Sequence, residues 1–489
     1  MPIIVVLLLT AACARVPWPE PPFGFGGSGS LALTAFAFLL PIGAAIVLSR
    51  WATVAVRHDP DRRPEIVRTY SRFRRLLGYA NLLVAVLAVV GLGWGWTVWN
   101  RATLPLGSER TLLAPMAELL VPAPYLLAVF AVWIIHYDAE RAFHSSNAQA
   151  EQPFWSRVGH FVFQLRPFAF LVLMPVVLFA TQQTFARIAP EAANSLYAQL
   201  ASALFIPVLF VGMPLLIKPA LGLQSMPGGP VRERFEAIAR RLRFRYSDLL
   251  HWPTRGQVVN AMVVGVVPRA RYVVFTDRLL DTLAPDELDA VFGHEVGHAK
   301  HGHIPFYVLF FILSAVAVTG LVGLGTVALA EKGWIDAAAW EPWAGLPPLV
   351  ALIGYIFLAF GFLSRQCERQ ADLFGCRVAS GGDRISPQGI DAMVRALEKV
   401  ADLSGMDAAN AAGRRPSFPR RMLALFRSWQ HGSIQERIRY LLEVLERPEL
   451  ERQFQWRVYL MKWAIVVGLV ASIVGIGSYF GWKEVAKAM

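Results

Sequence analysis

The chain has 489 residues, of which 55% are hydrophobic and only 17% are charged, and its mean hydropathy is +0.44. Soluble domains carry about 25% charged residues, so this composition excludes an ordinary soluble protein and is typical of a polytopic membrane protein. The net charge of +12 at pH 7 does not imply a nucleic-acid partner, because cytoplasmic loops of membrane proteins collect Lys and Arg and the sequence shows no nucleic-acid-binding motif.

The N-terminal region, residues 1–30, is expected to form a tail outside the membrane spans. Met1–Ala14 is apolar but lacks the basic start of a secretory signal peptide. The following stretch, PWPEPPFGFGGSGS, is rich in Pro and Gly and is typical of an exposed, flexible lead-in. The three cysteines of the chain form no C-x-x-C pair, so neither a disulfide framework nor a zinc knuckle is expected.

Eight apolar stretches approach or reach the length of about 20 residues that crosses a bilayer core. They are Leu31–Ser49, Leu76–Trp99, Leu119–Tyr137, Pro167–Thr181, Leu196–Ile217, Ile304–Ala330, Leu346–Ser364 and Trp463–Trp482. The sequence therefore predicts about seven or eight transmembrane helices.

Loop charges predict the orientation of these spans. The Arg50–Arg75 loop contains eight arginines, whereas the next loop contains only Arg101 and Arg110. The positive-inside rule then places Arg50–Arg75 in the cytoplasm. The order of the spans then also places two long polar segments, Lys218–His303 and Arg365–Arg457, on the cytoplasmic side. These two segments share a side because two spans, an even number, separate them. Together they are long enough for one compact domain.

The first polar segment ends in AVFGHEVGHAKHGH, where His294, Glu295 and His298 form the pattern H-E-x-x-H. On a helix, residues i and i+4 lie on one face, so both imidazoles can bind the same ion. The glutamate can then take a proton from a water that zinc has acidified to a pKa of about 7. The pattern is short and also occurs by chance, so its surroundings must be weighed.

The surroundings of this motif favour a helix preceded by strands. Pro285 and the acidic residues of the PDELD stretch are typical of a helix start. Upstream, Gln257–Val267 and Arg271–Thr276 are rich in β-branched residues and are predicted to be strands. We therefore expect a small α+β domain around the motif.

A hydrolytic zinc site needs a third protein ligand and an open position. His301 and His303 lie so near the motif in sequence that a supporting or interfacial role is favoured for them over direct binding. Glu368 is the better candidate, because it follows a span on the same side of the membrane. Asp372 lies one helical turn further on and can accept the second ring N–H of a ligand histidine.

These residues resemble a known family. The pattern H-E-x-x-H, followed two spans later by S-R-x-x-E-x-x-A-D, is similar to the integral-membrane zinc metallopeptidases that include the type I CAAX prenyl endopeptidases and the HtpX-like quality-control proteases. The matching pieces are Asn260-Ala261, TDRLLDTLAPDELDAVFGHEVGHAKHGH, SRQCERQAD and HGSIQERIRYL. They cover Gln257–His303 and Ser364–Leu441 and keep the order of the family.

The resemblance implies roles for individual residues. The zinc ligands would be His294, His298 and Glu368, binding one Zn²⁺ per chain, and Glu295 would be the general base. Asp372 would orient a ligand histidine.

The resemblance also implies roles around the substrate. Asn260 and Ala261 would lie along the strand edge where an extended substrate pairs. His431 would stabilise the oxyanion, although Gly432 stands where the family usually has proline. Arg437 would position substrate or support the structure.

The expected protein is thus a mainly α polytopic membrane protein with a cytoplasmic α+β zincin-like metallopeptidase domain split by two spans. The expected parts are a tail (1–30), a five-span region (31–217), the first peptidase half (218–303), two transmembrane helices (304–364), the second half (365–457) and a C-terminal transmembrane helix (458–489). Its expected function is zinc-dependent hydrolysis of membrane-associated polypeptides, prenylated or misfolded, at the cytoplasmic face of a multi-pass protein of the bilayer, with a bacterial inner membrane as the expected location.

Three alternative functions are considered. A metal-ion transporter would carry ionisable residues inside its spans, but the clustered histidines lie outside the apolar stretches. An intramembrane protease would carry H-E-x-x-H inside a span, but residues 286–300 are too polar to face lipid. A catalytically inactive scaffold is the third alternative, although all four positions of the metal site are present.

Overall fold

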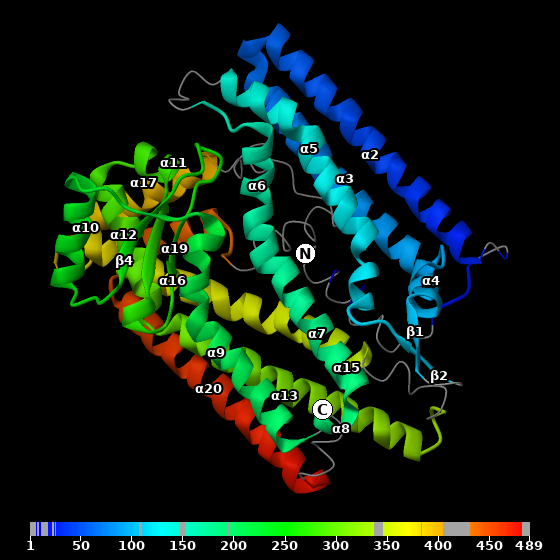
Figure 1. Cartoon of the computed structure of the whole chain (residues 1–489). Coiled ribbons are helices and arrows are strands. Elements are labelled where there is room, and N and C mark those ends of the chain that lie inside the picture. The colour runs from blue at the N-terminus through cyan, green and yellow to red at the C-terminus, as the bar shows by residue number, and fades with distance from the viewer. Residues whose placement is uncertain are drawn as a thin grey trace. The chain divides into compact units, whose positions relative to one another are not determined.

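The computed structural model describes residues 6, 9–10, 18–21, 24, 26–106, 110–146, 153–193, 195–336, 346–382, 384–403 and 431–481. The chain divides into two compact units, Met1–Ile206 and Pro207–Met489, and the division falls inside helix α9 (Leu196–Leu221). The described elements are mainly helices (Figure 1), which confirms the predicted fold class.

The N-terminal unit is built on three long helices that pack lengthwise, α2, α3 and α5 (Figure 1). Its described elements are α2 (Gly26–His58), η2 (Pro60–Arg62), α3 (Arg63–Val90), α4 (Trp94–Arg101), β1 (Thr103–Leu106), β2 (Arg110–Leu113), η3 (Ala117–Leu120), α5 (Ala123–Ser145), α6 (Arg157–Phe168), η4 (Ala169–Leu173), α7 (Met174–Ile188) and α8 (Pro190–Ala193). Strands β1 and β2 form an antiparallel hairpin.

Six helices of the described chain are long and apolar enough to cross a membrane. They are Gly26–His58, Pro60–Val90, Arg157–Ile188, His303–Glu331, Leu346–Ala379 and Glu449–Tyr479. Large apolar side chains such as Leu40 and Val47, each 69% exposed, lie on their outer faces. Such exposure suits contact with lipid rather than water.

The other two expected spans correspond to α5 and α9. Helix α5 is 23 residues long, but polar residues from His136 onward shorten its apolar part. Helix α9 has 26 residues, of which 196, 199–200 and 202–211 lie outside the residues whose side chains are described. Its described apolar part is Gly212–Leu221.

A four-stranded mixed sheet lies in the C-terminal unit. Its strands, in the order β3-β4-β6-β5, are β3 (Gln224–Ser225), β4 (Asp248–Trp252), β6 (Tyr272–Thr276) and β5 (Ala261–Val264). Strand β4 runs parallel to β6, whereas β5 is antiparallel to it, with Val263 opposite Val273. Strand β5 is therefore an edge of the sheet.

Strand β5 is shorter than the predicted strand Gln257–Val267, and the turns at its two ends explain the difference. Before the strand, the Thr254 hydroxyl accepts a hydrogen bond from the backbone N–H of Val258 at 3.2 Å and closes a turn. After the strand, Gly265 adopts a φ of +103°, which a β-branched residue would resist. The predicted strand Arg271–Thr276 matches β6 to within one residue.

The helices of the C-terminal unit surround this sheet and continue into the apolar spans. They are α10 (Pro230–Arg241), η5 (Pro268–Ala270), α11 (Asp277–Thr282), α12 (Pro285–Lys300), α13 (His303–Glu331), α15 (Leu346–Tyr355), η7 (Ile356–Phe360), α16 (Gly361–Ala379), α17 (Pro387–Leu403), α19 (Ile434–Glu446) and α20 (Glu449–Phe480). The sheet packs on helices through stacked rings, with Phe235 of α10 between Phe275 of β6 and Phe292 of α12 at centroid distances of 4.8 and 4.7 Å. This stack belongs to the main core of the unit.

Helix α12 begins where the acidic stretch predicts. Pro285 stands at its first turn, and the Glu287 carboxylate accepts a hydrogen bond from the backbone N–H of Ala284 at 2.8 Å. The helix ends at Lys300, and Gly302, with a left-handed φ of +62°, then turns the chain directly into α13. The motif helix and the following span are therefore joined by a single tight turn.

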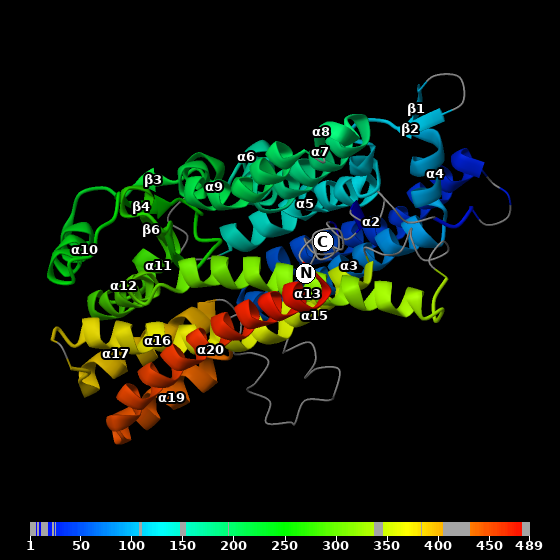
Figure 2. The same ribbon diagram turned by 90° about the horizontal axis from the view of Figure 1, so that it is seen from below.

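Helices α12 and α16 pack closely because glycines line their contact. A Cβ added at Gly293 would lie 2.6 Å from the Cβ of Val378, and one added at Gly375 would lie 2.5 Å from the carbonyl oxygen of Ala290. Helix α16 is continuous with α15 through the π-helical segment η7. In this unit α13 also lies alongside α20 and α15 (Figure 2).

Candidate metal and catalytic site

The H-E-x-x-H motif lies on α12 and faces the acidic residues of α16. The ligand atoms of His294, His298 and Glu368 all lie within 4.8 Å of one another. The Nε2 atoms of both histidines are 3.6 Å from a carboxylate oxygen of Glu368 and 3.1 Å from each other. The three side chains are at most 14% exposed. Two sequence segments, separated by two apolar helices, thus meet at one point.

His294 is oriented by an ion pair behind it. Its Nδ1 lies 2.9 Å from Oδ1 of Asp372, and a carboxylate can only accept there, so Nδ1 carries a proton and, in the neutral ring, Nε2 is the bare nitrogen. Arg437 of α19 donates to both oxygens of Asp372 at 2.7 and 2.5 Å. Burial disfavours charge on His294, but the hydrogen bond and the charge of Asp372 outweigh it and raise the pKa of the ring.

His298 is kept neutral by its surroundings. Burial lowers the pKa of the His298 ring to about 3, and the neighbouring His294 acts in the same direction. Its Nδ1 lies 2.9 Å from Nδ1 of His303. A neutral ring retains the lone pair that a metal ligand must offer.

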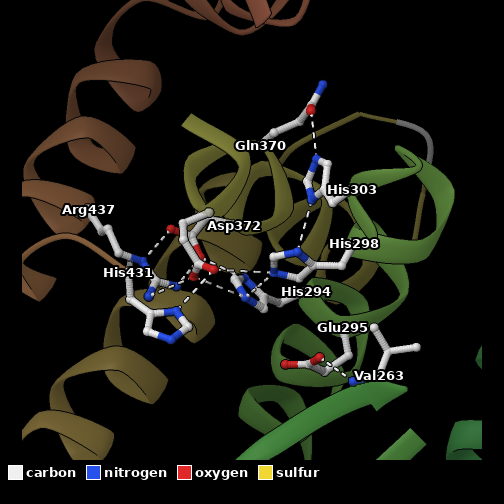
Figure 3. Close-up of polar contacts among 10 residues, drawn as sticks. Val263, His294, Glu295, His298, His303, Gln370, Asp372, His431 and Arg437 are labelled. Atoms are coloured by element: carbon white, nitrogen blue, oxygen red, sulfur yellow. Dashed lines mark hydrogen bonds and ion pairs between the residues drawn. The ribbon is translucent and has the colours of Figure 1, made fainter. Parts of the chain in front are cut away.

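Glu295 lies on the side of the motif that faces the sheet (Figure 3). One of its carboxylate oxygens accepts a hydrogen bond of 2.8 Å from the backbone N–H of Val263 in β5. Burial raises the pKa of the Glu295 carboxyl above its usual value, which makes it a stronger base. The edge strand and the carboxylate are therefore in direct contact.

His431 lies three residues before the start of α19 and contacts the same carboxylate as His294 and His298. Its Nδ1 lies 3.1 Å from Oε1 of Glu368, while its ring is 71% exposed. That hydrogen bond raises the pKa of His431. The ring thus borders the metal site from the solvent side.

The remaining residues singled out in the sequence divide between the sheet edge and the interior. Asn260 is exposed immediately before β5, its carbonyl accepts from the backbone N–H of Thr276 at 3.1 Å, and Ala261 begins the strand. Arg437 is only 9% exposed. Its contacts with Asp372, and with Glu368 at 3.4 Å, favour the structural role over contact with substrate.

Sequence reasoning favoured a supporting or interfacial role for His303 over direct metal binding. The three converging ligand atoms do not include one from His303, whose ring instead joins His298 to Gln370, with Oε1 of Gln370 2.9 Å from Nε2 of His303 (Figure 3). Gln370 was not identified from the sequence. It lies between Glu368 and Asp372 on α16 but off their shared face, so helical periodicity does not reveal it.

The donor set fits a zinc ion. Two neutral or neutralisable imidazoles and one carboxylate are the ligands of a common class of hydrolytic zinc sites. Both Nε2 atoms and the Glu368 carboxylate point at one place, and each of the two imidazoles is held by a hydrogen bond at its Nδ1. Such support at the second nitrogen is what orients a metal-binding histidine.

Part of the chain is similar in sequence to known peptidases. Residues 228–445 match the sequence model of Peptidase family M48. The chain is 25% identical over 189 residues to a CAAX prenyl protease 1 homolog of Arabidopsis thaliana, an alignment that covers 36% of this chain and 43% of that protein.

The chain is also similar in sequence to two HtpX proteases. The chain is 29% identical to a protease HtpX homolog of Archaeoglobus fulgidus, over 34% of this chain and 44% of that protein. It is 30% identical to protease HtpX of Thioalkalivibrio sulfidiphilus, over 37% of this chain and 59% of that protein. The chain thus covers less than two thirds of the length of each of these relatives. The crystal structure of S. mikatae Ste24p aligns with a TM-score of 0.49 at 14% identity, over 86% of this chain and 100% of that one.

The contact between Arg437 and Asp372 predicts a large effect on stability. In an Arg437→Met variant, the Asp372 carboxylate would remain buried without its cation, which costs about 3–5 kcal/mol in the free energy of unfolding. Denaturant unfolding of the detergent-solubilised protein measures this loss. Arg439→Met, on the exposed side of the same helix, serves as the control and should change stability by about 0.5 kcal/mol or less. Equal stability of the two variants would contradict the role given to the ion pair.

Proposed function

We propose that the protein is a membrane-embedded, zinc-dependent endopeptidase that hydrolyses peptide bonds of membrane-associated polypeptides. The observation that carries the proposal is the convergence of His294, His298 and Glu368 beside Glu295 within an M48 peptidase domain. The three converging residues would hold one zinc ion per chain. The ion would supply a Lewis acid that polarises a carbonyl group and lowers the pKa of a water molecule to about 7.

Glu295 acts as the general base in this proposal. Its buried carboxylate has a raised pKa, so it accepts a proton from the attacking water more readily than an exposed glutamate would. The same group can then return the proton to the leaving nitrogen of the peptide. The N–H of Val263 holds the carboxylate by one oxygen and leaves the other to meet the water.

His431 is assigned to the oxyanion that develops on the scissile carbonyl. Its Nδ1 is engaged with Glu368 at 3.1 Å, and its exposed ring borders the metal site. Because that contact raises the pKa of His431, its other nitrogen is well suited to donate to a developing negative charge.

The edge strand β5 is assigned to substrate binding. In the described chain no strand pairs with its outer side, and the Val263 N–H contacts Glu295. An extended peptide added along Asn260, Ala261 and Val263 would gain hydrogen bonds from the backbone groups of this edge that Thr276 and Glu295 do not engage. Such bonds place little demand on sequence. It would also pass directly over the general base.

The proposed substrates are membrane-associated because the metal site adjoins the apolar helices. His298 lies five residues before His303, where the span-length helix α13 begins, and Glu368 lies on the continuous α15–α16 helix. A scissile bond at this site is held close to the bilayer surface. Substrates with a lipid tail or a transmembrane segment suit this placement, and we favour general quality control slightly over processing of prenylated C-termini.

The peptidase domain is proposed to face the cytoplasm of a multi-pass membrane protein, with a bacterial inner membrane as the proposed location. The loop Arg50–Arg75 carries eight arginines and the next loop only two, a bias typical of a cytoplasmic loop followed by an external one.

Substitution at two glutamates separates metal binding from catalysis. Glu295→Gln should keep zinc but lose at least about 10²-fold in turnover, because an amide cannot accept the proton. Glu368→Ala should lose zinc as well as activity. Elemental analysis of the purified variants and a peptide-cleavage assay measure both properties. Full zinc occupancy in Glu368→Ala, or near-normal turnover in Glu295→Gln, would be incompatible with these roles.

Sidedness can be measured by cysteine labelling in a Cys13→Ser background, since Cys367 and Cys376 are buried. Arg269→Cys lies in an exposed turn of the peptidase unit and Lys332→Cys in the loop after α13. On intact cells, an impermeant thiol reagent should label Lys332→Cys but not Arg269→Cys. The reverse pattern would place the site outside.

A three-substrate comparison tests the substrate class. The purified protein is given a farnesylated peptide, its unprenylated twin and a denatured membrane protein, each with and without a zinc chelator. We expect chelator-sensitive cleavage of the membrane protein. Equal cleavage of the two peptides would remove the prenyl version. Preferential cleavage of a soluble unfolded protein over every membrane-anchored substrate would overturn the membrane proposal itself.

A further inference from the structure

The last apolar helix, α20, reaches the candidate metal site through a chain of buried hydrogen bonds. We infer that Lys462 of α20 is a positioning residue that fixes the tautomer of His298 through Gln370 and His303. This inference rests on the proposed metallopeptidase function, because it concerns how one of the metal-binding histidines is presented. It assigns a role to a helix that lies outside the matched residues 228–445.

The chain of contacts runs from α20 through α16 and α13 to α12. The Nζ of Lys462 lies 3.4 Å from Oε1 of Gln370, and that oxygen lies 2.9 Å from Nε2 of His303. The other ring nitrogen of His303, Nδ1, lies 2.9 Å from Nδ1 of His298. Figure 3 shows Gln370, His303 and His298 in this succession, ending beside His294.

The contacts with α20, at one end of this series of hydrogen bonds, determine which way the Gln370 amide points. A lysine ammonium group can only donate hydrogen bonds, so it must face the amide oxygen of Gln370 and not the NH₂ group. The NH₂ group is taken up separately, since Nε2 of Gln370 donates to Oε1 of Gln455 at 2.5 Å. Lys462 therefore selects the orientation of the amide, and Gln455 can accept from the NH₂ group that this orientation turns toward it.

The orientation of Gln370 then propagates to the metal site. Because the amide oxygen can only accept, Nε2 of His303 must carry a proton, and in the neutral ring Nδ1 is bare. A bare Nδ1 on His303 requires a proton on Nδ1 of His298, and the neutral His298 then has a bare Nε2. That nitrogen is the one that lies 3.6 Å from Glu368. This series of hydrogen bonds from Lys462 through Gln370 and His303 to His298, called the relay below, therefore presents a lone pair where the metal is proposed to bind.

Burial makes each step of this relay selective. His303 is fully buried and Gln370 is only 5% exposed, so water is not available to replace a mismatched partner, and an unpaired polar group there would cost about 1–3 kcal/mol. Lys462 is further tied to the site, because its ammonium group donates to the carbonyl oxygen of His301 at 3.2 Å and lies 5.7 Å from the ring centre of Phe306. The cation is thus held in place from two other sides.

The two metal-binding histidines are then supported in parallel ways. His294 is oriented by Asp372, which is anchored by Arg437 of α19. His298 is oriented by His303 and Gln370, which are anchored by Lys462 of α20. In each case a donor-only cation at the far end sets the direction of every hydrogen bond up to the ring.

The test uses the full-length protein in detergent and two pairs of variants. Lys462→Met and Gln370→Leu remove the polarity of the relay, whereas Lys462→Arg and Gln370→Glu preserve a donor and an acceptor at these positions. Lys332→Met, an exposed lysine at the end of α13, is the matched control. Zinc affinity is measured by competition with a chelator, and the tautomer of His298 by ¹⁵N NMR of the metal-free, histidine-labelled protein.

We expect zinc affinity to fall about 10–100-fold in Lys462→Met and Gln370→Leu, the usual cost of losing a partner of a metal-binding histidine. The conservative variants and the control should stay within about threefold of the unsubstituted protein. In the metal-free protein, the Nδ1–H tautomer of His298 should dominate and should lose its dominance in Lys462→Met. The conservative variants distinguish positioning from a simple packing role, because packing would not depend on hydrogen-bond polarity.

Unchanged affinity together with an unchanged His298 tautomer in Lys462→Met would overturn the inference. If Gln370→Leu does not fold, Lys462→Met and its arginine counterpart still decide the matter. Failure of the proposed function gives a different result, in which the unsubstituted protein binds zinc no better than His298→Ala. The tautomer of the metal-free protein remains a separate measurement in that case, and a dominant Nε2–H form would contradict the relay.

Discussion

The close contact between α12 and α16 is the constraint on which the candidate site depends. Two histidines on one helix and a carboxylate on another can bind the same ion only if the helix backbones approach closely. Glycines on both helices permit this, since a Cβ at Gly293 or Gly375 would collide with the opposite helix. The approach brings Glu368 to 3.6 Å from both imidazoles and places Asp372 directly behind His294.

A buried site of this kind concentrates polar groups that water would otherwise stabilise. His294, Glu295, Glu368, Asp372 and Arg437 are all less than a tenth exposed. Burying such groups is costly unless each is paired or hydrogen-bonded. The protein meets this requirement because single carboxylates serve several partners. Asp372 contacts both His294 and Arg437. Glu368 contacts four side chains, which are His294, His298, His431 and Arg437. The contacts that stabilise these buried groups also orient the ring nitrogens of His294 and His298.

The apolar helices of the C-terminal unit are part of the site's construction. Helix α13 starts one turn after the motif helix, and α16 continues directly from α15. Helix α20 packs along α13 and contributes Lys462 next to Gln370. The residues of the candidate site therefore lie on, or next to, helices of span length, and displacement of these helices would move the atoms proposed to bind the metal.

The sequence by itself was enough to predict which residues form the candidate site. The i, i+4 spacing of His294 and His298, and that of Glu368 and Asp372, places each pair on one helix face whatever the rest of the fold does. The acidic start of α12 and the β-branched segment of β6 were predicted for similarly local reasons. Tertiary structure alone decided the rest. The length of β5 depends on turns at Thr254 and Gly265. The contacts of Arg437 with Asp372 and of Lys462 with Gln370 join residues 65 and 92 positions apart. Such contacts leave no periodic signal, because they arise from the packing of whole helices and not from neighbours along the chain.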